Sequence, residues 1–206
     1  RGLGDVYKRQ GRDHEENEDS FLIDMTKNLF AVADGVTIPF GGKIASEKAI
    51  TYLKKYFNGN LLESILNCNK KICEEKKKNK RIGYTTISAI HIKNKFFELV
   101  NLGDSPIFLI REEKIKKLSE SHSFESRLTQ VIGMENISPY ASSLEVEKND
   151  ILILCTDGIT NVLSENEILS LKAKNPKVFV EKVLEKCEEK HQVYDDDKTI
   201  IVIFLG

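Results

Sequence analysis

The order of apolar and polar positions divides the chain into segments with two different periods. Short apolar runs bounded by turn-forming residues are typical of strands, and they occupy residues 20–24, 29–33, 84–92, 96–102, 106–111, 114–118, 144–146, 151–156 and 199–205. Between them, residues 43–57, residues 61–77 and two segments that begin near positions 165 and 176 repeat apolar residues at helical spacing. The pattern predicts one domain in which antiparallel sheet is covered by helices.

The same pattern predicts which side chains form the core. Residues 84–118 read as an antiparallel meander, because their apolar runs are separated only by short turns. The inward faces of the three longer helices are predicted to carry Ala45, Ala49, Leu53, Tyr56 and Phe57; Leu62, Ile65, Leu66, Ile72 and Cys73; and Phe179, Val183, Leu184 and Cys187.

Length and charge narrow the classes of function. The 206 residues, 40% of them hydrophobic, suffice for one core, and 31 Lys and Arg against 32 Asp and Glu give a net charge of -1. This balance favours neither nucleic acid nor an anionic membrane as the main partner. Without a long apolar run or a signal-like start, we expect a cytoplasmic protein that acts as a monomer.

Three further segments receive plain structural interpretations. Residues 1–10 fit none of the elements that follow, so we interpret them as a non-native leader and residues 11–206 as the single domain. The four cysteines lack CxxC spacing and are expected to be free thiols, mostly in the core. The basic run at 76–81 follows a helix, and such a run is usually a solvated connection.

Acidic residues stand where predicted strands meet loops. Two strands end in Asp-Gly, and each Asp-Gly taken alone fits a hairpin turn. Five strand ends carry acids, however, and ends on the same side of a sheet converge in space. These acids are Glu18, Asp19, Asp34, Asp104, Asp157, Asp196 and Asp197.

A cluster of carboxylates predicts a metal centre, because the acids would otherwise repel one another and raise one another's pKa. Oxygen ligands select Mg²⁺ or Mn²⁺, and none of the four histidines has the spacing of a zinc motif. Two such ions about 4 Å apart could activate water and clamp a phosphate ester. A calcium or structural site is the rival interpretation, but the chain has no DxDxDG loop.

Seven motifs in order resemble the PPM, or PP2C-type, metal-dependent serine/threonine protein phosphatases, in particular their bacterial branch. They are NEDSFLID, LFAVADGV with GGKIAS, GYTTISA, LVNLGDSPIFLIR, LTQVIG, ILILCTDGIT and DDKTIIVI. The resemblance implies an α+β fold, a four-layer α/β/β/α sandwich of two antiparallel sheets between helices. It also implies hydrolysis of phosphoserine and phosphothreonine by attack of a metal-bridging water.

The resemblance assigns roles to single residues. Asp34 would bridge two ions, with Glu18 and the Gly35 carbonyl completing one site and Asp157 and Asp196 the other. Asp104 would help Asp157 to hold a third, weaker ion, and Asp19 would orient metal-bound water. Cys155 is then part of the core and not a nucleophile.

Four departures from the family pattern bear on substrate binding, on protonation of the leaving group and on the charge near the metals. His14 stands where the family has a phosphate-binding arginine, with Arg12 nearby as a substitute, and Val36 stands where animal relatives have a histidine. The flap between positions 122 and 128 is short, and Asp197 replaces the common Asn. We therefore also consider a catalytically weak phosphoprotein-binding module and a phosphatase of small esters beside the leading hypothesis, a phosphatase that opposes a bacterial serine/threonine kinase.

Overall fold

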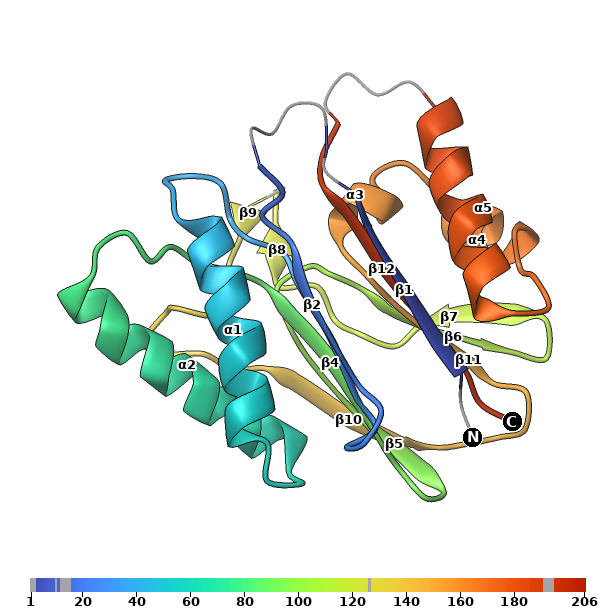
Figure 1. Ribbon diagram of the computed structural model, residues 1–206, viewed down its shortest axis with the longest axis horizontal. Coiled ribbons are helices and arrows are strands. Elements are labelled where there is room, and N and C mark those ends of the chain that lie inside the picture. Colours follow the sequence, from blue (N-terminus) through green and yellow to red (C-terminus); the bar gives the residue numbers. More distant parts are fainter. Residues whose placement is uncertain (1–2, 10, 12–15, 126, 191–194) are drawn as a thin grey trace.

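Two five-stranded antiparallel sheets lie face to face in the computed structural model, which describes residues 3–9, 11, 16–125, 127–190 and 195–206 (Figure 1). The first sheet has the order β10-β5-β4-β3-β2, with bounds Tyr140–Glu145, Phe96–Leu102, Ile87–Lys93, Leu29–Ala33 and Ser20–Asp24. The second has the order β1-β12-β11-β6-β7, with bounds Leu3–Arg9, Lys198–Phe204, Ile151–Cys155, Ile107–Arg111 and Lys114–Lys117.

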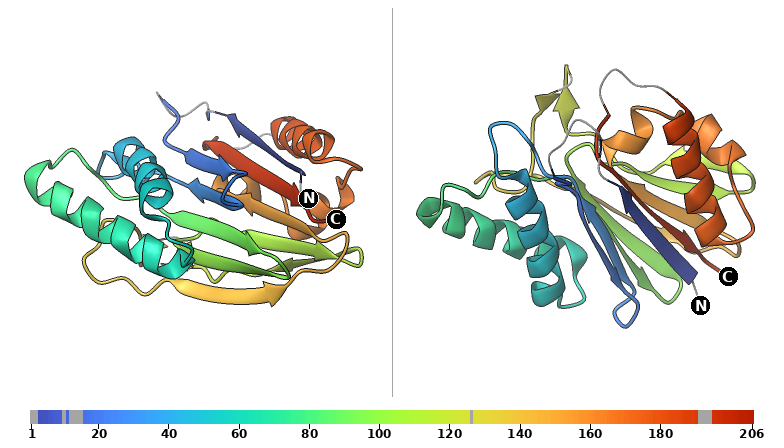
Figure 2. Two further views of the ribbon diagram at one scale, coloured as in Figure 1. Left: turned by 60° about the horizontal axis from the view of Figure 1, so that its bottom comes forward. Right: turned by 45° about the horizontal axis from the view of Figure 1, so that its top comes forward.

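Helices cover the outer face of each sheet. Helices α1 (Gly42–Tyr56) and α2 (Leu61–Lys78) lie on the first sheet, and α4 (Glu165–Ser170) and α5 (Pro176–Glu189) lie on the second, as the turned views in Figure 2 show. The four-layer α/β/β/α prediction is confirmed. Two small elements were not predicted, namely α3 (Asp157–Thr160) and a hairpin of β8 (Ser123–Phe124) and β9 (Arg127–Leu128).

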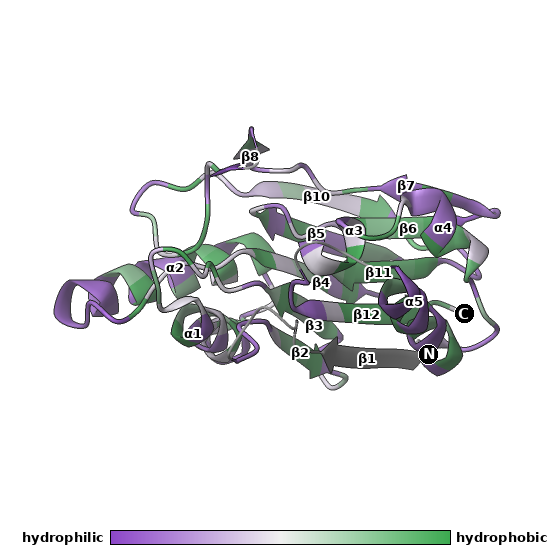
Figure 3. Ribbon diagram, turned by 90° about the horizontal axis from the view of Figure 1, so that it is seen from above, coloured by the Kyte–Doolittle hydropathy of each residue, from purple (hydrophilic) through white to green (hydrophobic). Residues whose placement is uncertain are grey.

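The core forms three layers because successive strand residues face opposite sides of a sheet. In β11, Leu152 and Leu154 pack between the two sheets, whereas Ile151 and Ile153 pack against α5. All five residues of this strand are buried, which is why it reads as an unbroken apolar run. The view in Figure 3 shows the strands as the hydrophobic centre and the exposed helical faces as hydrophilic.

The prediction of a meander over residues 84–118 is wrong. Strands β4 and β5 pair in the first sheet, whereas β6 and β7 pair in the second. The chain crosses between the sheets after Gly103, which has a φ of 105° that glycine adopts without strain. Local apolar periodicity is the same for a hairpin turn and for a crossover, so the pattern alone did not separate them.

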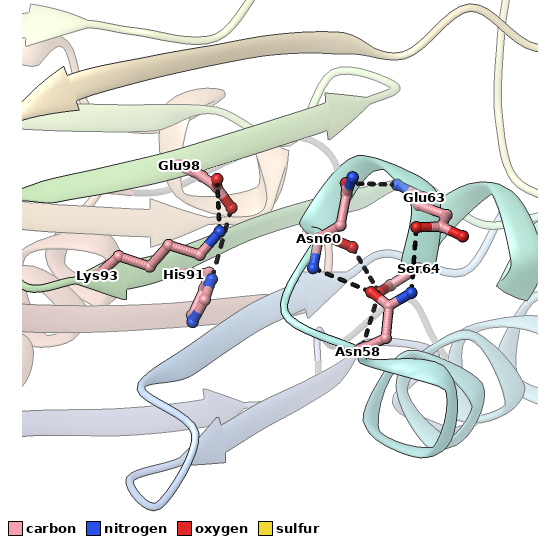
Figure 4. A network of polar contacts seen from close by, with 7 residues as sticks. All are labelled: Asn58, Asn60, Glu63, Ser64, His91, Lys93 and Glu98. Carbon is pink, nitrogen blue, oxygen red and sulfur yellow. Dashed lines mark hydrogen bonds and ion pairs between the residues drawn. The ribbon is translucent and has the colours of Figure 1, made fainter.

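The predicted inward face of α2 is also partly wrong. Leu62 is 36% exposed and Leu66 is 41% exposed, whereas Leu61, Ile65 and Cys68 are buried. The helix begins after Asn60, whose side chain accepts a hydrogen bond from the backbone N–H of Glu63, as an N-cap does (Figure 4).

Residues 3–9 do belong to an element, contrary to their exclusion from the fold. They form β1, which pairs with β12 in an antiparallel register from Leu3↔Phe204 to Arg9↔Lys198. Whether residues 1–10 are native is not tested by this pairing, and the domain limits stay a prediction.

Other expectations on the chain as a whole have simple outcomes. None of the described helices is both long and apolar enough to cross a membrane. All four cysteines are free thiols, and Cys68, Cys155 and Cys187 are buried while Cys73 is half-buried.

Candidate metal centre at one end of the sandwich

The strand register brings the acids of both sheets to the same end of the sandwich. Ser20 at the start of β2 pairs with Ala33 at the end of β3, so Asp19 and Asp34 are neighbours across the strands. In the second sheet, Cys155 at the end of β11 pairs with Ile200 near the start of β12. The starts of β2 and β12 lie at the same end of the molecule in Figure 1, beside α3.

Asp34 is the centre of this group. Its pKa is raised well above the usual range, first by burial and then by the charges of Asp19, Asp157 and Asp196. A hydrogen bond shared with Asp157 raises it further. Acids from three other segments of the chain therefore act on this one carboxyl group.

The peptide groups of Asp34 are held by two threonines that directly precede β4. Its N–H donates to Thr86 Oγ1 at 3.0 Å, and its carbonyl accepts from Thr85 Oγ1 at 2.7 Å and from the Thr86 N–H at 2.8 Å. Thr86 Oγ1 in turn lies 2.7 Å from Ser105 Oγ, in the turn that carries Asp104. The Asp34-Gly35 pair is thus anchored to its neighbours and is not a hairpin turn.

Asp104 belongs to the same electrostatic group. Burial raises its pKa to about 6, with smaller contributions from the charges of Asp157 and Asp196. The carboxylate of Asp104 is consequently costly to ionise near neutral pH unless a cation lies close to it.

Asp19 joins the two sheets. Its side chain is 1% exposed, and Oδ2 accepts hydrogen bonds from Thr156 Oγ1 at 3.0 Å and Thr199 Oγ1 at 2.6 Å. Thr199 lies on β12 of the second sheet and Thr156 directly follows β11 of the same sheet, whereas Asp19 leads into the first sheet. The two hydroxyls fix the orientation of this carboxylate.

Asp197 holds the segment that carries Glu18. One oxygen accepts the backbone N–H of Gly11 and the other accepts that of Glu18, both at 2.7 Å. This buried carboxylate uses both oxygens on backbone donors, so it anchors the chain that leads into β2.

Close backbone contacts bring the remaining parts of the site together. A Cβ atom added to Gly35 would lie 2.5 Å from Gly42 C and 2.7 Å from Glu18 O, and one added to Gly158 would lie 1.9 Å from Asp197 O. Only glycine allows either approach. The Glu18 carboxylate accepts the Thr37 hydroxyl at 2.6 Å and the Lys43 N–H at 3.4 Å, which directs it toward the start of α1.

The acid group has the chemistry of a site for hard cations. Asp157 Oδ1 is buried, and no hydrogen-bond donor faces it within the described residues, although Oδ2 accepts from Asn161 Nδ2 at 3.1 Å. A buried carboxylate oxygen without a donor is costly unless a cation takes the donor's place. Within the described residues, however, no group of three or more Asp, Glu, His or Cys side chains is arranged so that it could hold a metal ion. The predicted ligand set therefore stays a prediction.

Other predicted site residues have different outcomes. Arg12 and His14, the predicted phosphate-binding pair, lie outside the described residues. Burial raises the pKa of the Cys155 thiol far above neutrality, in agreement with its interpretation as a core residue. Val36 is half-buried on the loop that follows Gly35.

Thr156 and Thr199 are site residues that no sequence motif predicted. Each hydroxyl holds Asp19, and each stands next to or two residues from an acid of the cluster. A polar residue that interrupts a buried strand end beside a candidate ligand is the signal that would have identified them.

A cavity of about 670 Å³ lies at the far end of the second sheet and does not compete with the acids as the site. It is lined by Ile151 at the start of β11 and Phe204 at the end of β12, the opposite ends of these strands from Asp157 and Asp196. Its two acids are already paired, Glu113 with Lys172 and Asp150 with Arg111.

Comparison with known proteins agrees with this geometry. The family profile of protein phosphatase 2C matches residues 8–196. The serine/threonine phosphatase stp of Listeria welshimeri is 25% identical in an alignment of 198 positions that covers 77% of this chain and 78% of that protein.

Solved structures show the same fold. The PPM Ser-Thr phosphatase MsPP from Mycobacterium smegmatis superposes with a TM-score of 0.87 at 25% identity, over 99% of this chain and 98% of that one. The catalytic domain of the phosphatase PstP, in complex with two manganese ions, gives a TM-score of 0.89 at 21% identity, over 98% and 97% of the two chains. Because the family profile spans nearly the whole chain, this protein belongs to the protein phosphatase 2C family.

Proposed function

We propose that this protein is a metal-dependent phosphatase that hydrolyses phosphoserine and phosphothreonine in proteins. The observation that carries the proposal is the strand register that brings Asp19, Asp34 and Asp157 to one end of the sandwich. The pKa of Asp34, raised by burial and by the charges of Asp19, Asp157 and Asp196, agrees with this placement. Four acids from separate parts of the chain act on one another at one end of the sandwich. Such a cluster is stable at neutral pH when divalent cations neutralise it.

The residues that would hold the ions are those of the cluster. Asp34 with Glu18 and the Gly35 carbonyl would hold one, and Asp34 with Asp157 and Asp196 would hold the other; Asp104 with Asp157 would hold a weaker third. Mn²⁺ and Mg²⁺ both suit an all-oxygen ligand set. When bound, such ions lower the pKa of water and neutralise the charge that develops on a phosphate ester.

The protein supplies orientation and support for this chemistry. Asp19, held by the Thr156 and Thr199 hydroxyls, presents a fixed acceptor for a proton of water. Asp197 holds the backbone of Glu18, and the Gly35 contacts bring that segment against the start of α1. Because these groups are fixed before substrate binds, little reorganisation is needed during the reaction.

The substrates and partner follow from the family. The listerial relative is named a serine/threonine phosphatase, which supports phosphoproteins as substrates of this chain too. A bacterial serine/threonine kinase would then supply those substrates. PstP with two manganese ions supports Mn²⁺ as one of the metals.

The test is phosphate release from a phosphothreonine peptide by the purified full chain. We expect turnover with Mn²⁺, none with EDTA, and recovery when Mn²⁺ is added back. Asp157→Ala should lower kcat by about 100-fold or more, since one charged group that acts on the transition state contributes about that factor. The matched control is Glu185→Ala, an exposed acid on α5, which should leave kcat unchanged.

Two results would contradict the proposal. Turnover that persists in EDTA would exclude the acid cluster as a metal centre, and the absence of turnover with either metal would favour a phosphoprotein-binding module. A small phosphate ester measured in parallel distinguishes a third outcome, because a phosphatase of small esters would prefer that substrate to the peptide.

A further inference from the structure

An exposed surface of mixed basic and apolar character lies beside the loop that leaves the acid cluster. It surrounds a hollow of about 300 Å³ between that loop and the end of α2. We call it the Phe40–Lys80 surface, and it consists of Pro39, Phe40, Lys76, Lys77, Lys80 and Tyr84.

Backbone contacts fix this surface relative to the acid cluster. Val36 N–H donates to Tyr84 O at 2.9 Å, and Gly83 N–H donates to Gly41 O at 3.0 Å. A Cβ atom added to Gly83 would lie 2.3 Å from Phe40 O, so the two segments are in direct backbone contact. The loop that begins at Gly35 is thereby joined to the chain that follows the basic end of α2.

The surface carries positive charge in excess of its acids. Lys77 pairs with Glu135 at 3.2 Å, but both side chains are mostly exposed, so this pair is weak. Lys80 has no ion pair within the described residues. Lys76 is engaged internally, since its Nζ donates to Gly83 O at 2.9 Å and lies over the Tyr84 ring. Lysines favour helix C-termini for electrostatic reasons, but that preference does not explain the apolar side chains opposite them.

The loop presents large apolar side chains to solvent. Ile38 is 83% exposed and Phe40 is 57% exposed, on either side of Pro39. Phe40 is an aromatic side chain on an anchored loop, and it lies beside both a hollow and the lysine Lys80. Groups of this kind carry binding energy at protein interfaces.

The surface also lies within reach of a peptide that occupies the acid cluster. Asp34 and Pro39 are five residues apart, so at most about 18 Å of chain separates them. An extended substrate covers that distance in about five or six residues.

We propose that the Phe40–Lys80 surface binds a segment of the phosphoprotein substrate that is acidic and carries an apolar residue, four to six residues from the phosphorylated residue. The proposal rests on the proposed phosphatase activity and names the class of substrate. The basic run at the end of α2 then has a role in substrate binding and is not only a solvated connection. Attraction between opposite charges favours this class, and the apolar residue fills the hollow against Phe40.

The test compares three phosphothreonine peptides of equal length. One has Glu residues four to six positions before the phosphothreonine, one has them four to six positions after it, and the third has Gln at all these positions. With Mn²⁺ and low salt, we expect kcat/KM for one of the acidic peptides to exceed that for the Gln peptide about 3-fold to 10-fold. The preference should decline at high salt, because exposed charges are screened.

Two substitutions locate the preference. Lys77→Gln/Lys80→Gln should bring the ratio of kcat/KM for the acidic and Gln peptides close to 1. In an acidic peptide in which Leu replaces one residue beside the Glu residues, Phe40→Ser should lower kcat/KM. The matched control is Lys177→Gln/Lys182→Gln on α5, which removes the same charge from the other helical layer and should keep the wild-type ratio.

The outcomes separate the two proposals. If all three peptides are hydrolysed at the same rate, or if the α5 control loses the preference as well, the docking surface is wrong while the phosphatase activity stands. If none of the peptides is hydrolysed with Mn²⁺, the proposed activity itself is wrong.

Discussion

Asp197 illustrates how one residue can organise a site without being among its predicted ligands. Its two oxygens accept the N–H groups of Gly11 and Glu18, and an amide at this position could accept only one of them. The family commonly has Asn at this position. An Asn side chain has one acceptor oxygen and one N–H₂ donor, whereas the carboxylate of Asp197 has two acceptor oxygens.

We predict that Asp197→Asn lowers the free energy of unfolding by about 1–2 kcal/mol, because an amide N–H₂ would face a backbone N–H. Since Glu18 is a predicted ligand, the Mn²⁺ concentration for half-maximal activity should also rise. Urea unfolding and a Mn²⁺ titration measure the two effects, with Glu185→Gln as control. An unchanged Mn²⁺ dependence would mean that Asp197 supports the fold only.

Repulsion among the acids gives a second prediction at the residue scale. Asp157 raises the pKa of Asp34 through its charge, so the metal-free protein carries an electrostatic cost at neutral pH. Asp157→Asn should therefore raise the thermal midpoint of the protein in EDTA while it weakens Mn²⁺ binding.

Thermal unfolding with and without Mn²⁺ checks this prediction independently of activity. At 100 times its dissociation constant an ion stabilises the native state by about 2.7 kcal/mol, and this corresponds to roughly 5–10 °C for a domain of this size. We expect the wild type to show a shift of that order and Asp157→Asn to show much less. Equal shifts in the two proteins would exclude Asp157 as a ligand.

At the scale of elements, the period of apolar residues distinguished strands from helices correctly. The wrong predictions concern which face of a helix is buried and which strands pair with each other. Residues 29–33 and 151–155 are strands as predicted, and the helix predicted at 61–77 is α2. Its burial is centred on Leu61, Ile65 and Cys68, one position from the predicted Leu62 and Leu66. Several apolar residues at adjacent positions fit two faces of a helix, and packing against the sheet selected one.

His91 on β4 makes the stability of the first sheet dependent on pH. Burial, the largest effect, lowers the pKa of His91, and Glu98, whose Oε2 lies 3.5 Å from Nδ1, opposes the shift (Figure 4). Lys93 is the other charged neighbour, and the Phe57 ring packs against the imidazole at a centroid distance of 4.6 Å.

The folded protein therefore binds the His91 proton less readily than the unfolded chain, whose histidine has a pKa of about 6.5. Stability from this residue is fully present above that pKa and is lost as pH falls from it through the lower pKa of the folded state. We predict that urea unfolding shows a decline in stability that begins as pH falls below about 7, and that the decline is smaller in His91→Gln. A steeper decline in the variant would mean that folding raises the pKa of His91 and does not lower it.

The whole molecule depends on pairing between segments that are distant in sequence. Strand β1 pairs with β12 over seven positions, although residues 1–10 were predicted to lie outside the domain. Without β1, strand β12 would become an edge of the second sheet, and its N–H and C=O groups on that side would lose their partners.

We predict that removal of residues 1–9 lowers the free energy of unfolding by about 3 kcal/mol, from several backbone hydrogen bonds of about 0.5–1.5 kcal/mol each. For a domain of this size that is a fall of roughly 6–12 °C in the thermal midpoint. Differential scanning calorimetry of the two proteins measures it. An unchanged midpoint would show that β1 contributes nothing to stability and would support the interpretation of residues 1–10 as a leader.

By itself, the sequence determined the type and order of the main elements, the four-layer family fold and the set of acids at strand ends, because period and motif are local properties of the chain. Only the tertiary structure decided that β5 and β6 belong to different sheets, that Thr156 and Thr199 hold Asp19, and that Phe40 lies beside the lysines of α2. These relations depend on strand register and on where the chain crosses between layers. Both follow from packing between residues far apart in sequence, which no local pattern contains.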